Sequence, residues 1–169
     1  RKGASAWTDA VIKIVHRRLA DFERARDKED FCPGYKSASQ EEREVCWLLM
    51  IAGVAKKESD FIATDSFEEG DGTYSHGLLS LSTGECANAP TVSELHDPVR
   101  NLVCGTNMMA SLIARHGFVD GPESSRGAGA YWSTLRSPYS DAAGHSLGKK
   151  ADIMAITRSF RKPPIKLVP

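Results

Sequence analysis

Apolar side chains return every three or four positions in three long segments of the chain, residues 5–26, 41–58 and 98–116. This is the period of an amphipathic helix, so each segment is predicted to be a helix with one face in the core. The third segment begins at Asp97-Pro98, a pair that can cap free backbone amides and start a helix, and it ends before Gly117. The core positions predicted in this way are Trp7, Val11, Ile14, Val15, Leu19, Phe22, Val45, Leu48, Leu49, Ala52, Ala55, Val99, Leu102, Val103, Met109, Leu112 and Ile113.

The segments between these helices are polar and rich in turn residues. Residues 27–40 and 64–72 are predicted to be loops, and residues 74–82 a turn with short extended pieces, because Gly77 interrupts them. A shorter helical pattern covers residues 150–158, and a proline-rich tail, expected to be exposed, follows it. At 169 residues the length favours one domain. The prediction is therefore a single α+β, mainly α domain over residues 1–169, with a small β or turn region.

Composition and charge narrow the class of partner. Lys plus Arg and Asp plus Glu each number 22, so the formal net charge is zero. Nucleic-acid binding requires a clustered excess of basic residues, so we expect no nucleic-acid partner. The longest apolar runs, such as residues 46–55, fall short of the ~20 residues that a bilayer crossing requires, so no membrane span is expected. The chain starts at Arg1 without a charged-then-apolar leader, which fits a trimmed mature form, and we expect a monomer.

The four cysteines, Cys32, Cys46, Cys86 and Cys104, form no C-x-x-C pair. Structural zinc sites usually show such close spacing, so disulfides are favoured. Separations of 14 and 18 residues suit two local bridges, Cys32 with Cys46 and Cys86 with Cys104, each worth about 3 kcal/mol. Other pairings, and four reduced thiols in a cytosolic protein, are the alternatives. Disulfides would place the protein outside the cytosol.

Glu58 is the first candidate for chemistry. It lies at the predicted C-terminal end of a helix, close to Phe61 and the apolar helix face. The negative end of the helix dipole and apolar surroundings both disfavour an ionised carboxylate, so we expect the pKa of Glu58 to be raised. A glutamic acid that stays protonated can donate a proton to a glycosidic oxygen. The alternative is a solvated carboxylate that pairs with Lys56 or Lys57.

Four short motifs follow one another in the chain. They are Glu58-Ser59-Asp60-Phe61, Ser75-His76-Gly77-Leu78, Asp97-Pro98-Val99-Arg100-Asn101 with Gly105, and Ala130-Tyr131. In this order they resemble the motifs of lytic transglycosylases and goose-type lysozymes, members of the lysozyme-like superfamily. The resemblance covers about residues 44–131 and places the motif-bearing core at about 41–135. It implies a lysozyme-like fold with the small β region beside a substrate cleft.

The resemblance also implies roles for individual residues. Glu58 corresponds to the catalytic general acid of the family, Ser75 to a small polar residue that lines the cleft, and Tyr131 to the cleft tyrosine. Ser80 stands where the family has a substrate-binding Gln, and Trp132 where it has an Asn. Trp132 could offer its ring to a sugar, or it could be an ordinary core tryptophan. The Asp97 motif is expected to be structural.

The reaction depends on a second carboxylate. An inverting hydrolase needs a base to activate water, whereas a lytic transglycosylase uses one glutamate and a hydroxyl of the substrate. Counting back six positions from Gly77, as in goose-type lysozymes, gives Asp71 as the candidate base, while the other acidic position of those enzymes is occupied by Ser82. The expected function is therefore a muramidase that cleaves the bond between N-acetylmuramic acid and N-acetylglucosamine. A lytic transglycosylase that forms 1,6-anhydro ends is the alternative.

The acidic loop that contains Glu68, Glu69 and Asp71 suggests a substrate preference. Three carboxylates beside a sugar cleft would attract a cationic sugar. N-deacetylated peptidoglycan carries glucosammonium groups, so we expect binding of these sugars, with a solvated acidic loop as the alternative. The expected location of such an enzyme is secreted or periplasmic, in bacteria.

Other kinds of chemistry find little support. The five histidines show no metal-ligand spacing, and neither a metal nor another cofactor is expected. The string Gly144-His145-Ser146-Leu147-Gly148 has the spacing of a serine nucleophile turn, but no strand pattern precedes it, so a loop is predicted. The alternative from another functional class is an inactive module that binds peptidoglycan.

Overall fold

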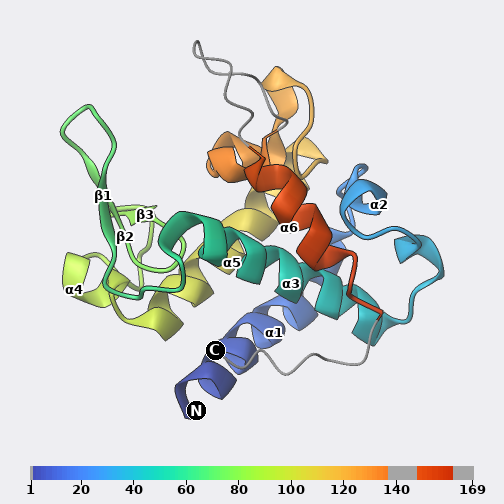
Figure 1. The fold of residues 1–169 in the computed structure, drawn as a ribbon, viewed down its shortest axis with the longest axis horizontal. Helices are drawn as coiled ribbons and strands as arrows, with labels where there is room; N and C mark the ends of the chain where they lie inside the picture. The colour runs from blue at the N-terminus through green and yellow to red at the C-terminus, as the bar shows by residue number, and fades with distance from the viewer. Residues whose placement is uncertain (1, 137–147, 162–169) are drawn as a thin grey trace.

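The computed structural model of the protein describes residues 2–136 and 148–161 (Figure 1). Its α-helices are α1 (Lys2–Phe22), α2 (Lys28–Phe31), α3 (Gln40–Ser59), α4 (Val92–Leu95), α5 (Pro98–His116) and α6 (Lys149–Thr157). Four 3-10 helices are η1 (Tyr35–Ser37), η2 (Glu123–Ser125), η3 (Gly127–Ala130) and η4 (Ser133–Leu135). The strands are β1 (Ser66–Glu68), β2 (Tyr74–His76) and β3 (Leu81–Ser82). This confirms the predicted α+β, mainly α fold.

The ends of the long helices follow local capping chemistry. Ser39 and Glu42 form a reciprocal capping box at the start of α3, which satisfies two backbone amides that lack helical partners. The side chain of Asp97 accepts a hydrogen bond from the backbone N–H of Arg100 at 2.8 Å. Gly117, with a φ of 76°, ends α5 as predicted.

Three predictions about the connecting segments were wrong or incomplete. Residues 27–40 contain α2 and η1, the acidic segment 64–72 contains β1, and α4 was not predicted. These elements span three or four residues each, too few for a periodic pattern to show. Residues 144–147 of the candidate nucleophile turn, and the proline-rich tail from residue 162, lie outside the described residues.

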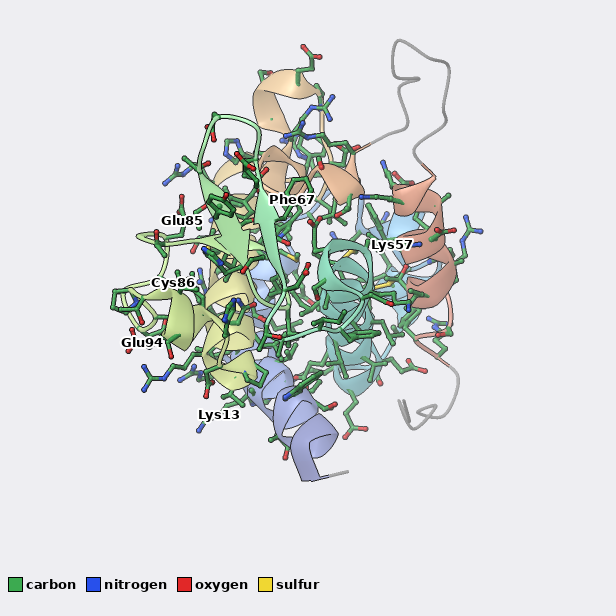
Figure 2. The ribbon with its side chains drawn as sticks, turned by 60° about the vertical axis from the view of Figure 1, so that its left-hand side comes forward. Lys13, Lys57, Phe67, Glu85, Cys86 and Glu94 are labelled. Atoms are coloured by element: carbon green, nitrogen blue, oxygen red, sulfur yellow. A yellow bond between two sulfur atoms is a disulfide. The ribbon has the colours of Figure 1, made fainter. Side chains whose placement is uncertain are left out.

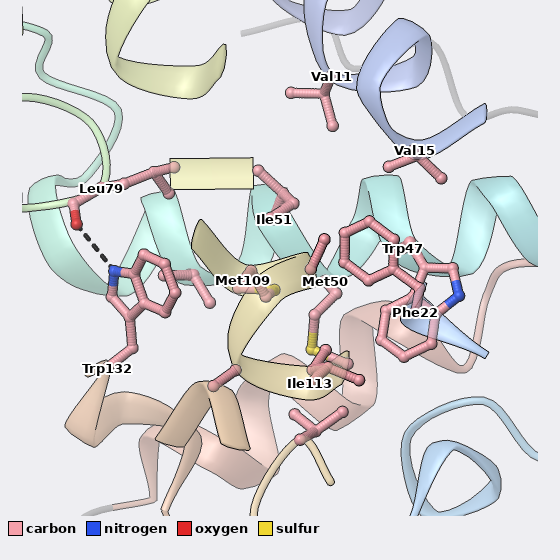
Figure 3. Packing of buried hydrophobic residues seen from close by; sticks show 14 of the residues in the cluster. Val11, Val15, Phe22, Trp47, Met50, Ile51, Leu79, Met109, Ile113 and Trp132 are labelled. Atoms are coloured by element: carbon pink, nitrogen blue, oxygen red, sulfur yellow. Dashed lines mark hydrogen bonds between the residues drawn. The ribbon is translucent and has the colours of Figure 1, made fainter. Parts of the chain in front are cut away.

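The core lies where α1, α3 and α5 meet (Figure 3). Trp47 of α3 is fully buried, packs against Phe22 of α1 with ring centroids 4.9 Å apart, and donates its indole N–H to the Tyr35 hydroxyl at 2.8 Å. Met50 and Met109 continue this core between α3 and α5. Within the described part of the chain, no helix is both long and apolar enough to cross a membrane.

The sheet is antiparallel, in the order β1-β2-β3. In Figure 1 its first two strands form a hairpin that projects from the helical body, beyond the C-terminal end of α3. Both predicted disulfides are present. Cys32–Cys46 joins the segment after α2 to α3, and Cys86–Cys104 joins the segment after β3 to α5.

Candidate active site

Glu58 is the penultimate residue of α3, and the helix end that carries it is firmly held. The hydroxyl of the next residue, Ser59, donates hydrogen bonds to the backbone oxygens of Ala55 (3.1 Å) and Leu78 (3.0 Å). Asp60 then takes the left-handed conformation, with a φ of 53°, and ends the helix. The last turn of α3 is thereby tied to the segment between β2 and β3.

The carboxyl group of Glu58 is partly buried and hydrogen-bonded. Its Oε1 accepts a hydrogen bond from the hydroxyl of Thr134 at 2.7 Å, and the Ser80 side chain is also hydrogen-bonded to it. Burial raises the pKa of Glu58 above its usual value, and the charge of Glu69 raises it further. The Thr134 and Ser80 hydrogen bonds and the charge of Lys149 act in the opposite direction. The net pKa remains raised, as the sequence predicted.

The two lysines that precede Glu58 pair with other carboxylates. Lys56 forms an ion pair with Asp60, and Lys57 with Asp152 of α6. Neither pairing involves the Glu58 carboxyl, whose hydrogen bonds run to hydroxyl groups. The expected alternative, a helix-end glutamate that pairs with Lys56 or Lys57, is wrong.

Hydrogen bonds from a buried asparagine hold the segment that brings Ser80 to Glu58. The buried Asn101 side chain accepts a hydrogen bond from the backbone N–H of Leu79 (2.9 Å) and donates to the backbone oxygens of His76 (3.0 Å) and Leu95 (2.9 Å). Gly77 passes so close to Asn101 that a side chain would not fit there. Ser80 itself has a φ of 48°, a conformation that few non-glycine residues adopt. The motif residues Gly77 and Asn101 therefore position the segment at Glu58.

Two residues expected to contact sugar are core residues. Trp132 is 2% exposed and donates its indole N–H to the backbone oxygen of Leu79 at 2.8 Å (Figure 3). Its ring is covered on all sides, so of the two alternatives for Trp132 the structure supports the core role. Ser75 is also 2% exposed, and its hydroxyl is buried without a hydrogen-bond partner among the described residues. Ser75 thus lies beneath the surface instead of lining it.

Tyr131, which the sequence predicted to be a cleft residue, lies next to the segment that carries Ser80. Its hydroxyl accepts a hydrogen bond from the backbone N–H of Ser82 (3.1 Å) and donates to the backbone oxygen of Ser80 (3.4 Å). Burial raises the pKa of Tyr131, and the charges of Glu85 and Glu69 add to this effect. Through these two hydrogen bonds Tyr131 holds strand β3 and the preceding residue in place, near Glu58 and Glu69.

The hairpin separates the acidic residues of the predicted loop. Asp71 is fully exposed in the turn, where its Oδ1 accepts hydrogen bonds from the backbone N–H (2.9 Å) and hydroxyl (2.6 Å) of Thr73. These hydrogen bonds lower the pKa of Asp71. Glu69 is instead the carboxylate whose charge acts on Glu58. The structure places Asp71 in the exposed turn of the hairpin, where Thr73 holds its carboxylate.

Thr134, whose hydroxyl contacts the carboxyl group of Glu58, was not predicted from the sequence. Thr134 lies in η4, 76 positions along the chain from Glu58. No periodicity or family motif singles it out, and only the packing of η4 against α3 brings the two together. Among the described residues, no group of three or more His, Cys, Asp or Glu side chains could hold a metal ion.

Comparison with known proteins supports the fold. No family model and no curated protein matches the sequence. Three solved structures of DslA (Bd0314) are similar: the wild-type form with a TM-score of 0.73, and two variants, each with a glutamate replaced by glutamine, with TM-scores of 0.74 and 0.75. Each is 24% identical, and the alignment covers 93% of this chain and 90% of DslA. Over nearly its whole length, this chain has the fold of DslA.

Proposed function

We propose that the protein is a glycosidase that cleaves the glycan strands of peptidoglycan, with Glu58 as its general acid. The observation that carries the proposal is a glutamate with a raised pKa that is held by Thr134 and Ser80, with Glu69 close enough to act on it. A protonated Glu58 gives its proton to the glycosidic oxygen as the bond from that oxygen to the sugar carbon breaks. The bond proposed for cleavage joins N-acetylmuramic acid to N-acetylglucosamine.

Glu69 is the proposed second carboxylate. It would take a proton from water, whose oxygen then attacks the sugar carbon on the face opposite to the leaving group. The two glutamates replaced in the DslA variants lie eleven positions apart in that protein, and Glu58 and Glu69 lie eleven positions apart here. This equal spacing favours Glu69 over Asp71, and it favours hydrolysis over the transglycosylase reaction, which needs one glutamate.

Glu69 also supports a preference for N-deacetylated glycan. The negative charge of Glu69 would attract an ammonium group on the sugar beside Glu58. An acetylated sugar is neutral at this position and would not be attracted. The exposed turn residue Asp71 adds a second negative charge to the same hairpin. We therefore propose that deacetylated peptidoglycan is the better substrate. The two disulfides are compatible with a secreted or periplasmic protein, which is the location that this substrate requires.

Product analysis tests the proposal. Purified peptidoglycan, acetylated or deacetylated, is digested and the fragments are weighed by mass spectrometry. Hydrolysis gives reducing ends, and transglycosylation gives 1,6-anhydro ends that are one water molecule lighter. We expect reducing ends and faster release from deacetylated material. Glu69→Gln should stop release, whereas Glu68→Gln, a change at the adjacent exposed carboxylate, should leave it within about twofold. Anhydro ends, or full activity of Glu69→Gln, would exclude Glu69 as the base.

A further inference from the structure

One row of side chains crosses the sheet on the side of Glu58. Phe67 of β1 is paired with Ser75 of β2, and Ser75 is paired with Ser82 of β3. Directly paired residues point to the same face, so these three side chains share one face of the sheet. The Ser82 side chain is hydrogen-bonded to Tyr131. Glu69, two positions after Phe67, continues this face, and its charge acts on Glu58.

The other face of the hairpin is turned toward α4. It carries Ser66, Glu68, Tyr74 and His76. The Ser66 hydroxyl is hydrogen-bonded to Nδ1 of His76 at 2.8 Å and to Nε2 of His96, just after α4, at 3.2 Å. The ring of Tyr74 stacks on that of His76. The side chains of this second face thus contact one another and His96. The first face instead carries Glu69, whose charge acts on Glu58.

Phe67 is unusually exposed for a residue in this position. Its exposed fraction, 60%, is the highest among the large apolar side chains that the structure describes as exposed. Figure 2 shows Phe67 on the projecting hairpin. No ring of another described residue packs against it, whereas Tyr74 on the other face has His76 as its neighbour. The benzyl group thus presents an uncovered ring on the Glu58 side of the sheet.

The neighbours of Phe67 on its face are polar. They are Ser82, with Tyr131 beyond it, and Glu69 about 7 Å along the strand, while Ser75 of the row is buried beneath the surface. A single aromatic ring with hydroxyl and carboxylate neighbours is too small a patch to bind an apolar protein surface. A sugar ring has the matching chemistry, because it combines an apolar face of C–H groups with a rim of hydroxyl groups.

We propose that Phe67 is a sugar-binding platform. Its ring stacks on the C–H face of one sugar unit of the glycan, while the glycosidic bond next along the strand lies at Glu58. This inference rests on the proposed function and adds a binding subsite to it. Since the stacking is apolar, it acts equally on acetylated and deacetylated sugars, unlike the charge of Glu69.

The chain offers a matched control for this proposal. Phe67 and Tyr74 are both exposed aromatic residues of the same hairpin, at 60% and 49%, but they lie on opposite faces. Phe67→Ala and Tyr74→Ala are compared with the parent protein, each carrying Glu58→Gln so that bound glycan is not cleaved. The probe is a peptidoglycan tetrasaccharide without peptide stems, in acetylated and deacetylated forms, and dissociation constants are measured by calorimetry.

We expect Phe67→Ala to weaken binding about tenfold, which corresponds to about 1.4 kcal/mol, by the same factor for both forms of the probe. Tyr74→Ala should change the dissociation constant less than twofold, and Phe67→Trp should restore the parent affinity. In the active protein, Phe67→Ala should raise KM and leave kcat within about twofold. Equal urea midpoints for the two alanine variants establish that both are folded to the same degree.

Several results would overturn the platform. These are unchanged binding by Phe67→Ala, an equal loss with Tyr74→Ala, or a loss confined to the deacetylated probe, which would indicate attraction of an ammonium group instead of stacking. The proposed catalytic role of Glu58 is tested separately by the activity of Glu58→Gln. A glycan-binding protein without activity would therefore refute the glycosidase and leave the platform standing.

Discussion

Gly77 provides a sharp test of how the segment that carries Ser80 is held at Glu58. Its φ is +74°, and a Cβ atom added there would lie 2.3 Å from the backbone oxygen of Leu95 and 2.4 Å from Nδ2 of Asn101. Real Cβ atoms do not approach other heavy atoms so closely, and the backbone oxygen cannot swing aside as a flexible side chain could. Gly77→Ala must therefore displace either the segment or the Asn101 amide.

Two contributions determine how much Gly77→Ala lowers the free energy of unfolding. An alanine in the left-handed conformation costs about 1–2 kcal/mol. The Asn101 side chain makes three hydrogen bonds to the backbone, and losing two or three of them at about 1 kcal/mol each adds about 2–3 kcal/mol. We therefore expect Gly77→Ala to lower the free energy of unfolding by about 3–5 kcal/mol.

Gly84→Ala is the matched control. Gly84 has a φ of +95°, but a Cβ atom there would meet nothing within 4 Å. Only the conformational cost of about 1–2 kcal/mol applies to it. Both variants are measured by urea denaturation of the oxidised protein. If Gly77→Ala is no more destabilising than Gly84→Ala, then the close packing of Gly77 on Asn101 does not hold the segment, and this part of the account is wrong.

Two further predictions concern the charge state of Glu58 and the disulfide near the sheet. The Thr134 hydroxyl stabilises the ionised form of Glu58 and the charge of Glu69 destabilises it, so Thr134→Val should raise the pKa of Glu58 and Glu69→Gln should lower it. Carbon-13 NMR titration of the glutamate carboxyls measures both, and shifts in the same direction would contradict the arrangement. Because the acid must be protonated to act, the activity of Thr134→Val should persist to higher pH. Replacing Cys86 and Cys104 together by serine should lower the free energy of unfolding by about 3 kcal/mol, measured in urea, and an unchanged midpoint would show that the bridge adds no stability.

The long helices could be predicted from the sequence because local signals determine where they begin and end. Asp97, Pro98 and Gly117 mark both ends of α5 within the chain itself. The raised pKa of Glu58 could be predicted because the residue lies at the end of a helix, close to apolar side chains. The pairing of Cys86 with Cys104 could be predicted for a similar reason, since the separation is short.

The rest of the site depends on pairing between distant segments. Asp71 and Glu69 are two residues apart, and the sequence does not show which of them faces Glu58, because that depends on the turn and register of the hairpin. Trp132 could be an exposed or a core residue until the packing of its indole on Leu79 is known. The exposure of Phe67 likewise follows from the three-residue strand β1, which has no periodic signal.

The proposed glycosidase depends on proton donation from Glu58 to the glycosidic oxygen, and the rate of peptidoglycan cleavage by Glu58→Gln tests this claim. Glutamine keeps the size of the side chain and can still hydrogen-bond to Thr134, but it has no acidic proton to give. We predict a rate on deacetylated peptidoglycan at least about 100-fold below that of the parent protein, with Glu68→Gln within about twofold of it. A Glu58→Gln protein that cleaves the glycan at the parent rate would contradict the claim.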